Sequence, residues 1–412
     1  MKRDSGVTGM SSSRSTIKNV ENIFIMLGGG SLGAFGCGVF KGFMKRNFRI
    51  DVAAGTSIGA VNAAIIVGSK SGHPEIDLEE FWLEIAESTP SIIPDIFPLD
   101  YDKDARTYVP TTTSSAAANA ALFGVPKMFV PRWLMWNCTP ELKDKENLFD
   151  PVSWTYMYDH SPLAKTLDKY IDYKKLNLAA TPKEEEKPEV LRLIMTAVNV
   201  MTAKPLIFDN TKKEIKAKHI LASAGYPLYG FHWVEVQDGV YAWDGGLLSN
   251  TPIREVIYSS PRNDKNIIIV ENYPQRIERL PSNLMEVQSR ARDILFCDKD
   301  MDDIKMSKFI TRQIQLIQRL YDVFERFEQD SGFQPSEIAR IKSEYNTLIQ
   351  KYGARILSVT RIIRSEIEPP TVLKNANFSP HAVKELIAQG EAKAIEKIDK
   401  LSKDNPATRT VI

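Results

Sequence analysis

The stretch "NIFIMLGGGSLGAFGCGVFKGFMKRN" at residues 22–47 decides the fold class of this chain. A short apolar run of the kind that forms a buried strand passes directly into a glycine turn, and apolar residues then recur at helical spacing over 35–43. The next segments repeat this order, because "FRIDVAAGTS" (48–57) predicts a second strand and "SIGAVNAAIIVGSK" (57–70) predicts a helix rich in small residues. Strand, turn and helix in repeated succession are typical of a parallel α/β sheet with helices on its faces.

Composition excludes several classes of protein. The 412 residues carry 53 Lys+Arg against 52 Asp+Glu, a net charge of +1, so no global field indicates a nucleic-acid partner or an anionic surface. The chain is 43% hydrophobic and 25% charged, as in ordinary globular proteins. Three cysteines (Cys37, Cys138 and Cys297) do not form a disulfide framework and suit a reducing compartment; we interpret them as buried thiols.

The N-terminal segment and the apolar windows bear on localisation. Residues 1–21 are polar and Ser-rich, lack the apolar core of a secretory signal, and are predicted to be a disordered lead-in. The longest apolar window, Val52–Gly68, is interrupted by glycines and polar residues and is not a membrane span. We therefore expect a cytoplasmic protein, peripheral at membranes, without signal peptide or transmembrane segment; signal-independent secretion stays open.

The rest of the chain divides into three parts. Further strands are predicted at 191–200, 205–208 and 266–270, and a helix at 216–224, so that residues 22–275 form the α/β domain. The alternation of strands and helices stops over about 90–150, which is a proline-rich insertion of the kind that forms a lid or a binding loop. Residues 276–412 form a mostly helical extension, with charged helices at 282–329 and 335–352, a strand in 354–368 and a last helix at 380–403.

The glycine turn allows two interpretations. Gly28, Gly30 and Gly33 satisfy the dinucleotide fingerprint G-x-G-x-x-G. A dinucleotide site also needs an acid at the carboxyl end of the second strand, whereas Asp51 stands at the start of that strand. No Gly-Lys-Ser/Thr follows the turn either, so a P-loop is excluded.

"GTSIG", Gly55 to Gly59, is a G-x-S-x-G motif between a strand and a helix, the setting of a nucleophile elbow. The turn would project the Ser57 hydroxyl, and the helix N-terminus would favour the negative charge that develops in acyl transfer. The amides of Gly29 and Gly30 would lie beside Ser57 and form, with the amide after the nucleophile, an oxyanion hole. The alternative is that Ser57 is only an N-cap.

The general base is harder to find. None of the five histidines (His73, His160, His219, His232 and His381) stands in a recognisable triad setting. "YAWDGGLLSNTP" (241–252) instead places Asp244 after a short strand, and Gly245 and Gly246 would let its carboxylate approach a serine closely. The alternative is a β-turn with Asp at its first position.

In this order and separation, "GGGSLG" (28–33), "GTSIG" (55–59) and "DGG" (244–246) resemble the patatin-like phospholipases. "VAAGTSIGAVNAA" and "HILASAGYPLY" are similar to the segments around the family's nucleophile and before its aspartate. The resemblance covers residues 22–275. It implies a three-layer sandwich with a mainly parallel central sheet.

The resemblance also implies a mechanism. Ser57 would attack the ester carbonyl, Asp244 would act as general base, and the turn of Gly28, Gly29 and Gly30 would hold the oxyanion, with motif support from Gly33, Gly55, Gly59, Gly245 and Gly246. Neither metal nor cofactor is implied. The family often has Arg or Lys where this chain has Leu32, which leaves the head-group preference open.

The expected substrate is a lipid or a membrane surface. "ALFGVPKMFVPRWLMW" (121–136) is the candidate wall of an acyl channel, and Arg132, Trp133 and Trp136 suit a bilayer interface; packing on the domain is the alternative. "KFITRQIQLIQRLYDVFERF" (308–327) is amphipathic and favours packing or self-association through the C-terminal helices over membrane binding.

The sequence predicts a serine lipid acyl hydrolase of phospholipase A or lysophospholipase type that works through an acyl-enzyme. Two alternatives stay open. One is an esterase acting on polyhydroxyalkanoate, or transfer of the acyl group to another alcohol. The other is a non-catalytic lipid-binding or scaffold protein that retains the fold.

Overall fold

The computed structural model describes residues 20–92, 99–102, 107–110, 112–137, 154–178, 191–259, 263–297, 301–327, 332, 334–352, 354–365 and 374–404. Most of the expected N-terminal lead-in, Cys138, Gln329, and parts of the insertion and of the C-terminal extension lie outside these residues.

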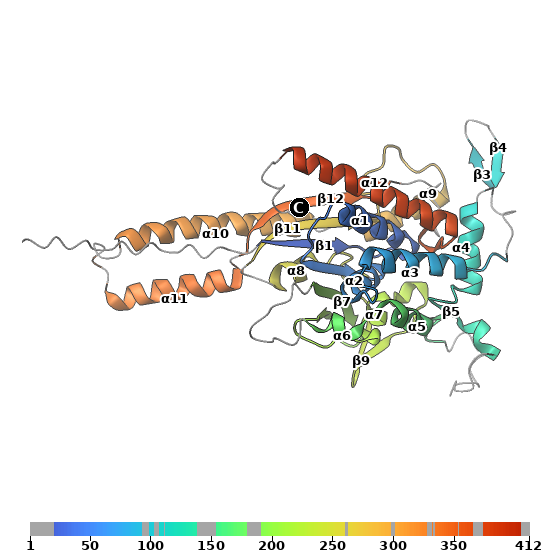
Figure 1. Cartoon of the computed structure of the whole chain (residues 1–412), viewed down its shortest axis with the longest axis horizontal. Helices are drawn as coiled ribbons and strands as arrows, with labels where there is room; N and C mark the ends of the chain where they lie inside the picture. Colours follow the sequence, from blue (N-terminus) through green and yellow to red (C-terminus); the bar gives the residue numbers. More distant parts are fainter. Residues whose placement is uncertain are drawn as a thin grey trace, which may run out of the picture.

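A mixed, mainly parallel sheet forms the centre of the molecule (Figure 1). Its path runs β12-β11-β1-β2-β7-β10-β9, with β8 paired to β7 off this path. The neighbours from β12 to β7 are parallel, whereas β8, β9 and β10 pair antiparallel. The strands are β1 Val20–Met26, β2 Val52–Thr56, β7 Arg192–Asn199, β8 Pro205–Asp209, β9 Val234–Gln237, β10 Val240–Asp244, β11 Asp264–Glu271 and β12 Ile356–Ile363.

The two faces of the sheet bury alternate residues of the same strands. In β1, Phe24 and Met26 belong to the larger core, while Ile23 and Ile25 belong to a smaller core on the opposite face. This is the period-2 alternation of a strand whose two faces are both covered. The predicted three-layer α/β fold with a mainly parallel sheet is confirmed.

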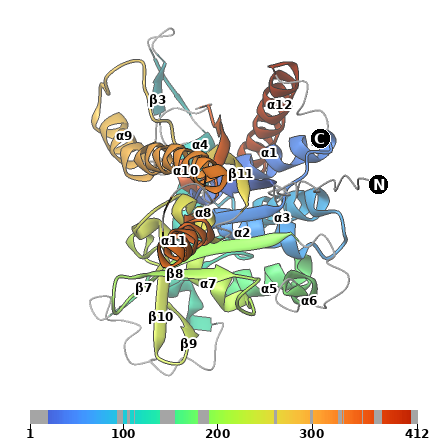
Figure 2. The same ribbon diagram turned by 90° about the vertical axis from the view of Figure 1, so that its left-hand side faces the viewer.

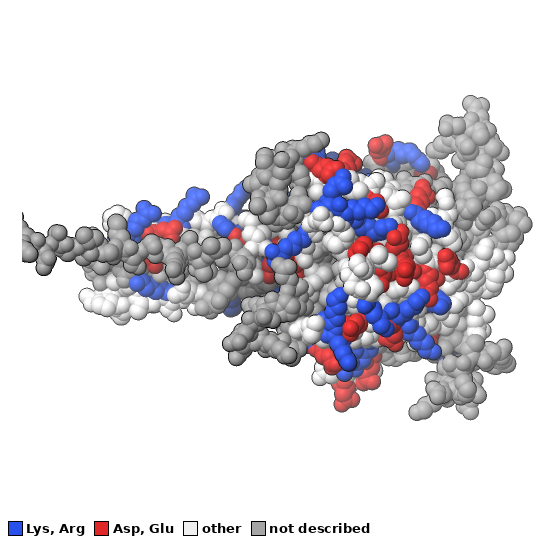
Figure 3. All heavy atoms as spheres, viewed as in Figure 1, with Lys and Arg blue, Asp and Glu red and all other residues white. Residues whose placement is uncertain are grey.

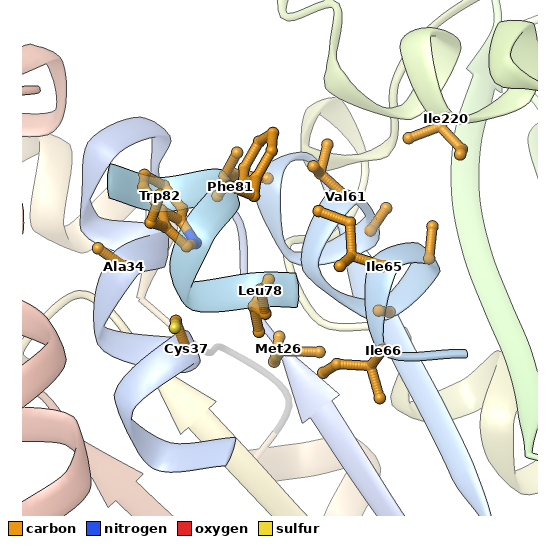
Figure 4. Close-up of a cluster of buried hydrophobic side chains, with 14 of the residues drawn as sticks. Met26, Ala34, Cys37, Val61, Ile65, Ile66, Leu78, Phe81, Trp82 and Ile220 are labelled. Atoms are coloured by element: carbon orange, nitrogen blue, oxygen red, sulfur yellow. The ribbon is translucent and has the colours of Figure 1, made fainter. Parts of the chain in front are cut away.

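Helices cover the face of the larger core. They are α1 Gly33–Lys45, α2 Ile58–Gly68, α3 Pro74–Ser88, α5 Ser161–Tyr170, α6 Tyr173–Leu176, α7 Ala217–Ala224 and α12 Pro380–Asp404, whereas α8 Ile253–Ser259 packs on the other face. Figure 4 shows Met26 of β1, Cys37 of α1 and Leu78 of α3 converging in this core. Buried Asn62 joins three helices, because its amide donates to the Gly33 carbonyl (2.9 Å) and accepts from the Trp82 indole (3.0 Å).

The insertion contains more regular structure than its composition suggested. The stretch "TTSSAAANAALF" forms helix α4 Thr112–Phe123, since alanine has the highest helix propensity and the stretch contains no proline or glycine. Short strands accompany it: β3 Leu99–Asp102 with β4 Thr107–Pro110, and β5 Val130–Pro131 with β6 Tyr158–Asp159. Short 3-10 helices include η1 Gly30–Leu32, η2 Arg132–Asn137, η6 Pro227–Tyr229, η7 Gly245–Leu247 and η9 Lys374–Ala376.

The C-terminal region joins the sheet and its helical layer. Strand β12 pairs in parallel with β11, and α12 lies along α1 (Figures 1 and 2). The region predicted as one charged helical stretch over 282–329 is two helices, α9 Leu284–Phe296 and α10 Met301–Phe327, because Cys297 turns to an extended conformation after α9. Helix α10 and α11 Pro335–Tyr352 extend away from the sheet (Figure 1).

Small residues allow α1 and α12 to pack closely. A Cβ at Gly38 would lie 1.9 Å from the carbonyl oxygen of Ile387, and one at Gly390 would lie 2.2 Å from that of Phe35. Ion pairs flank the contact, between Lys45 and Glu391 and between Arg46 and Asp399.

We expect Gly38→Ala to destabilise the protein by about 2 kcal/mol, because the added methyl group displaces the backbone of α12. Gly36→Ala is the matched control on the same helix, since its nearest contact would be the Asn62 side chain at 3.3 Å. Denaturant unfolding measures both variants. Equal losses of unfolding free energy would show that the α1–α12 contact does not limit stability.

Two surface observations bear on membranes. Among the described residues, no helix combines the length and the apolar character needed to cross a bilayer. Lys and Arg side chains are interspersed with Asp and Glu over the face shown in Figure 3, in keeping with the balanced composition.

Candidate active site

Ser57 occupies a strained turn between β2 and α2. Its φ of 59° and ψ of −130° lie in a region that side-chain-bearing residues rarely adopt, and it is the N-cap of α2 without a side-chain capping bond. A Cβ at Gly55 would lie 2.2 Å from the backbone of Gly59, and one at Gly59 would lie 2.0 Å from the Met26 carbonyl oxygen. The glycines therefore allow the strand and helix contacts that a nucleophile elbow requires.

The glycine turn lies directly beside Ser57. Met26 of β1 pairs with Gly55 of β2, so both strands end at the same edge of the sheet. A Cβ at Gly28 would lie 2.8 Å from the Cβ of Ser57. Gly30 has a φ of +57°, which glycine adopts without cost, and its carbonyl accepts from the Gly33 amide where the 3-10 turn leads into α1.

Two asparagines fix the orientation of the turn. Asn272 Nδ2 donates to the carbonyls of Leu27 (3.0 Å) and Gly28 (3.1 Å). In a trans peptide the C=O and N–H groups point in opposite directions, so this contact directs the amides of Gly28 and Gly29 away from Asn272. The Gly28 amide donates to Asn250 Oδ1 (3.0 Å), whereas within the described residues no hydrogen bond occupies the amides of Gly29 and Gly30.

Asp244 ends β10 next to the elbow. Thr56 pairs with Thr196 of β7, and Asp244 pairs with the next residue of that strand, Ala197. The carboxylate is 1% exposed and its Oδ1 accepts from the Gly246 amide at 2.7 Å. A Cβ at Gly245 would lie 2.6 Å from Thr196 Oγ1, so glycine is needed where the chain crosses β7.

Burial raises the pKa of Asp244 to about 7, while the Ser57 hydroxyl and the Gly246 amide act in the opposite direction by stabilising the charged form. No cation contributes to this shift. Oδ2 is buried and makes no hydrogen bond of ordinary geometry. A carboxyl with these properties suits a general base at neutral pH, since its proton affinity is close to the ambient pH.

Ser57 and Asp244 open into an apolar cavity of about 220 Å³. The 121–136 segment and the C-terminal region both contribute to its wall. Apart from the glycine turn, Ser57 and Asp244, the lining residues include Ile58, Ala121, Met128, Phe129, Tyr158, His160, Leu163, Tyr226, Tyr229, Phe231, Asn250, Tyr273, Arg292, Phe296, Asn375, Ala376 and Phe378. Such a wall suits an acyl chain.

The surroundings of the five histidines do not favour any of them as the base. His160 lines the cavity, but burial lowers its pKa and its Nε2 contacts the Leu221 carbonyl at 3.1 Å. His219 is buried in α7, with its pKa lowered by burial to about 4. His73 and His381 are exposed, and His232 packs against Trp233 with the two rings tilted and their centroids 4.5 Å apart.

For Arg132 and Trp133 of the insertion, the contacts favour packing on the domain over a role at a bilayer interface. Arg132 is buried against the rings of Trp154 and Tyr156, and the Trp133 indole donates to the Leu122 carbonyl at 3.0 Å. Both side chains are engaged within the protein. The side chain of Trp136 lies outside the described part.

Sequence reasoning missed Asn250, Asn272, Arg292 and Asn375. Asn250 follows the DGG motif by only a few residues, so its place in "SNTP" was a usable signal. The other three come from segments without a glycine or nucleophile pattern, and only the tertiary fold brings them to the turn.

Comparisons with known proteins bear on the family of this chain. Residues 24–257, more than half of the chain, match the family model described as patatin-like phospholipase. Among solved structures, the crystal structure of VipD from Legionella pneumophila is similar, with a TM-score of 0.37 and 16% identity over 92% of this chain and 67% of that chain. Curated proteins gave no match. The extent of the family match shows that this chain belongs to the patatin-like phospholipases, a family of lipid acyl hydrolases.

Proposed function

We propose that the protein hydrolyses carboxylic esters of lipids, as a phospholipase A or lysophospholipase, through a Ser57–Asp244 dyad and an acyl-enzyme. The observation that carries this proposal is the juxtaposition of a strained serine and a buried carboxyl with a pKa of about 7 at the end of an apolar cavity.

In the first half-reaction, Ser57 Oγ forms a bond to the ester carbonyl carbon while its proton passes to the Asp244 carboxylate. The tetrahedral intermediate collapses as the bond to the leaving alcohol breaks, and Asp244 returns the proton to that alcohol. The product of this half is an ester between the acyl group and Ser57. In the second half, water attacks this ester, Asp244 takes its proton, and the fatty acid leaves Ser57 free.

The oxyanion is held by backbone amides. Ile58, the residue after the nucleophile, supplies one, and Gly29 and Gly30 supply the others. The Gly28 amide is not part of this set, because Asn250 already accepts its hydrogen bond. Each such donor contributes about 3 to 4 kcal/mol to the lowering of the barrier.

The substrate is expected to place its acyl chain against the aromatic and aliphatic wall of the cavity. Phe129, Phe231 and Phe378 come from three distant segments, and Phe129 contacts both of the others edge to face. Polyhydroxyalkanoate remains a second ester class for the same chemistry.

Labelling with a fluorophosphonate probe followed by peptide mapping tests the proposal. An activated serine reacts at Ser57, and the phosphonyl oxygen occupies the oxyanion hole. We expect one labelled peptide, containing Ser57. Absence of labelling in folded protein, with and without lipid micelles, would favour the non-catalytic lipid-binding alternative.

A further inference from the structure

Arg292 lies at the catalytic cavity although it belongs to the C-terminal region, outside the family match. It is on helix α9, and its Nη1 donates to the side-chain oxygen of Asn375 at 3.0 Å. Its guanidinium also lies over the ring of Tyr229, 5.7 Å from the centroid. These contacts hold the group in one place.

Within the described part of the chain, no acidic side chain forms an ion pair with Arg292. Its neighbour Asp293 forms a buried ion pair with Lys374 instead. The pKa of Asp244 is raised by burial, and no cation is among the groups that oppose this rise. Of the five N–H donors of a guanidinium, only one is used by Asn375.

The position of Arg292 relates directly to the oxyanion turn. The Asn375 carbonyl oxygen lies 2.3 Å from the site of a Gly30 Cβ, so Asn375 joins the turn to Arg292. The hydroxyl of Tyr229 is buried beside the Asn375 side chain and makes no hydrogen bond of ordinary geometry in the described part of the chain. Arg292, with no ion pair among the described residues, and Tyr229 therefore line the same cavity as Ser57.

We propose that Arg292, assisted by the Tyr229 hydroxyl, binds the phosphate of a glycerophospholipid substrate and so determines a preference for phospholipids over neutral glycerides. This inference rests on the proposed function. In a glycerophospholipid the phosphate and the scissile ester belong to the same glycerol unit, only a few bonds apart. A guanidinium suits a phosphate because its donors match two oxygens at once.

The first experiment compares hydrolysis of a phosphatidylcholine and a diacylglycerol with identical acyl chains. We expect Arg292→Gln to lower the ratio of the two kcat/KM values by roughly 10- to 100-fold, mainly through KM for the phospholipid. Arg292→Lys keeps the positive charge but loses the paired donors of the guanidinium, so it should retain part of the preference for the phospholipid. Arg276→Gln removes an exposed arginine outside the cavity and should leave both rates unchanged.

An unchanged ratio in Arg292→Gln would overturn the proposal, as would an equal loss for both substrates, which would indicate a structural role. If Arg292→Gln does not fold, the proposal is tested with Arg292→Lys and with the dependence of the wild-type kcat/KM ratio on salt concentration. Phosphate recognition by Arg292 would be contradicted if the kcat/KM ratio did not change with ionic strength and was also unchanged in Arg292→Lys.

A second experiment separates this inference from the proposed function. Calorimetric titration of Ser57→Ala protein with monomeric octylphosphocholine and with octanol needs no catalysis. We expect Arg292→Gln in this background to weaken binding of octylphosphocholine about tenfold more than binding of octanol. Equal weakening, or binding of inorganic phosphate as tight as that of octylphosphocholine, would overturn the head-group assignment even if hydrolysis occurs.

Discussion

Ser57→Ala is expected to lower ester hydrolysis by at least about 10⁴-fold, because it removes the hydroxyl that would form the acyl-enzyme. The fold should survive. Alanine adopts the backbone of the elbow, with its φ of 59°, as readily as serine does, and the close contacts of Gly55 and Gly59 are unchanged. Initial rates with a lipid ester and a thermal melt measure the two effects.

Ser223→Ala is the matched control for this variant. Ser223 is buried beneath the elbow, where its hydroxyl accepts from the Ser57 amide (3.3 Å) and donates to the Thr196 carbonyl (2.7 Å). Its loss should cost less than about tenfold in rate, since it supports the turn without touching the reacting atoms. Similar losses in both variants would mean that the turn geometry, and not the Ser57 hydroxyl, carries the activity.

Asp244→Asn is expected to lower the rate by roughly 10²- to 10⁴-fold, because an amide does not accept the serine proton. In the wild type the active form of Asp244 is the carboxylate, so the rate should rise with pH through about 7. This rise should be absent from the residual activity of Asp244→Asn. A pH–rate profile for both proteins, with the same lipid ester, tests the assignment.

The same substitution is expected to stabilise the protein at high pH. Burial raises the pKa of Asp244 in the folded state from 3.8 to about 7, so folding favours the protonated form. The stability from this group is present below pH 4 and is lost as pH rises through 7. At pH 8 the buried charge costs about 4 kcal/mol, part of which an asparagine recovers because it keeps the Gly246 bond.

Denaturant unfolding at pH 5 and pH 8 measures this effect. Asp238→Asn removes the same charge from an exposed position between β9 and β10, and should change stability little at either pH. If Asp244→Asn is less stable than the wild type at pH 8, the carboxylate has a stabilising partner and is not held ready as a base.

The sequence was informative where local chemistry constrains the backbone. The turn of Gly28 to Gly30, the elbow at Ser57 and the end of β10 at Asp244 were all predicted, because a sharp turn or a close approach demands glycine at fixed spacing. The structure places these segments together at one edge of the sheet. Their catalytic roles stay predictions until the variants are measured.

What could not be predicted depends on contacts between distant segments. Asn272 reaches the glycine turn from the end of β11, and Asn375 reaches it from a segment more than 300 positions away. No periodicity or motif in the sequence predicts either contact. The boundary between α9 and α10 was missed for a related reason. Charged helical composition continues across it, while the end of α9 directs Phe296 into a cluster with Tyr273 and Tyr226.

The contact between Gly30 and Asn375 has a consequence for how the protein is made. The segment that packs on the glycine turn is synthesised more than 300 residues after the turn and Ser57. At translation rates of 5–20 residues per second, roughly tens of seconds separate the two. In a nascent chain, therefore, the glycine turn is made well before the segment that packs on it, and the cavity beside Ser57 gains this part of its wall only after Asn375 has been synthesised.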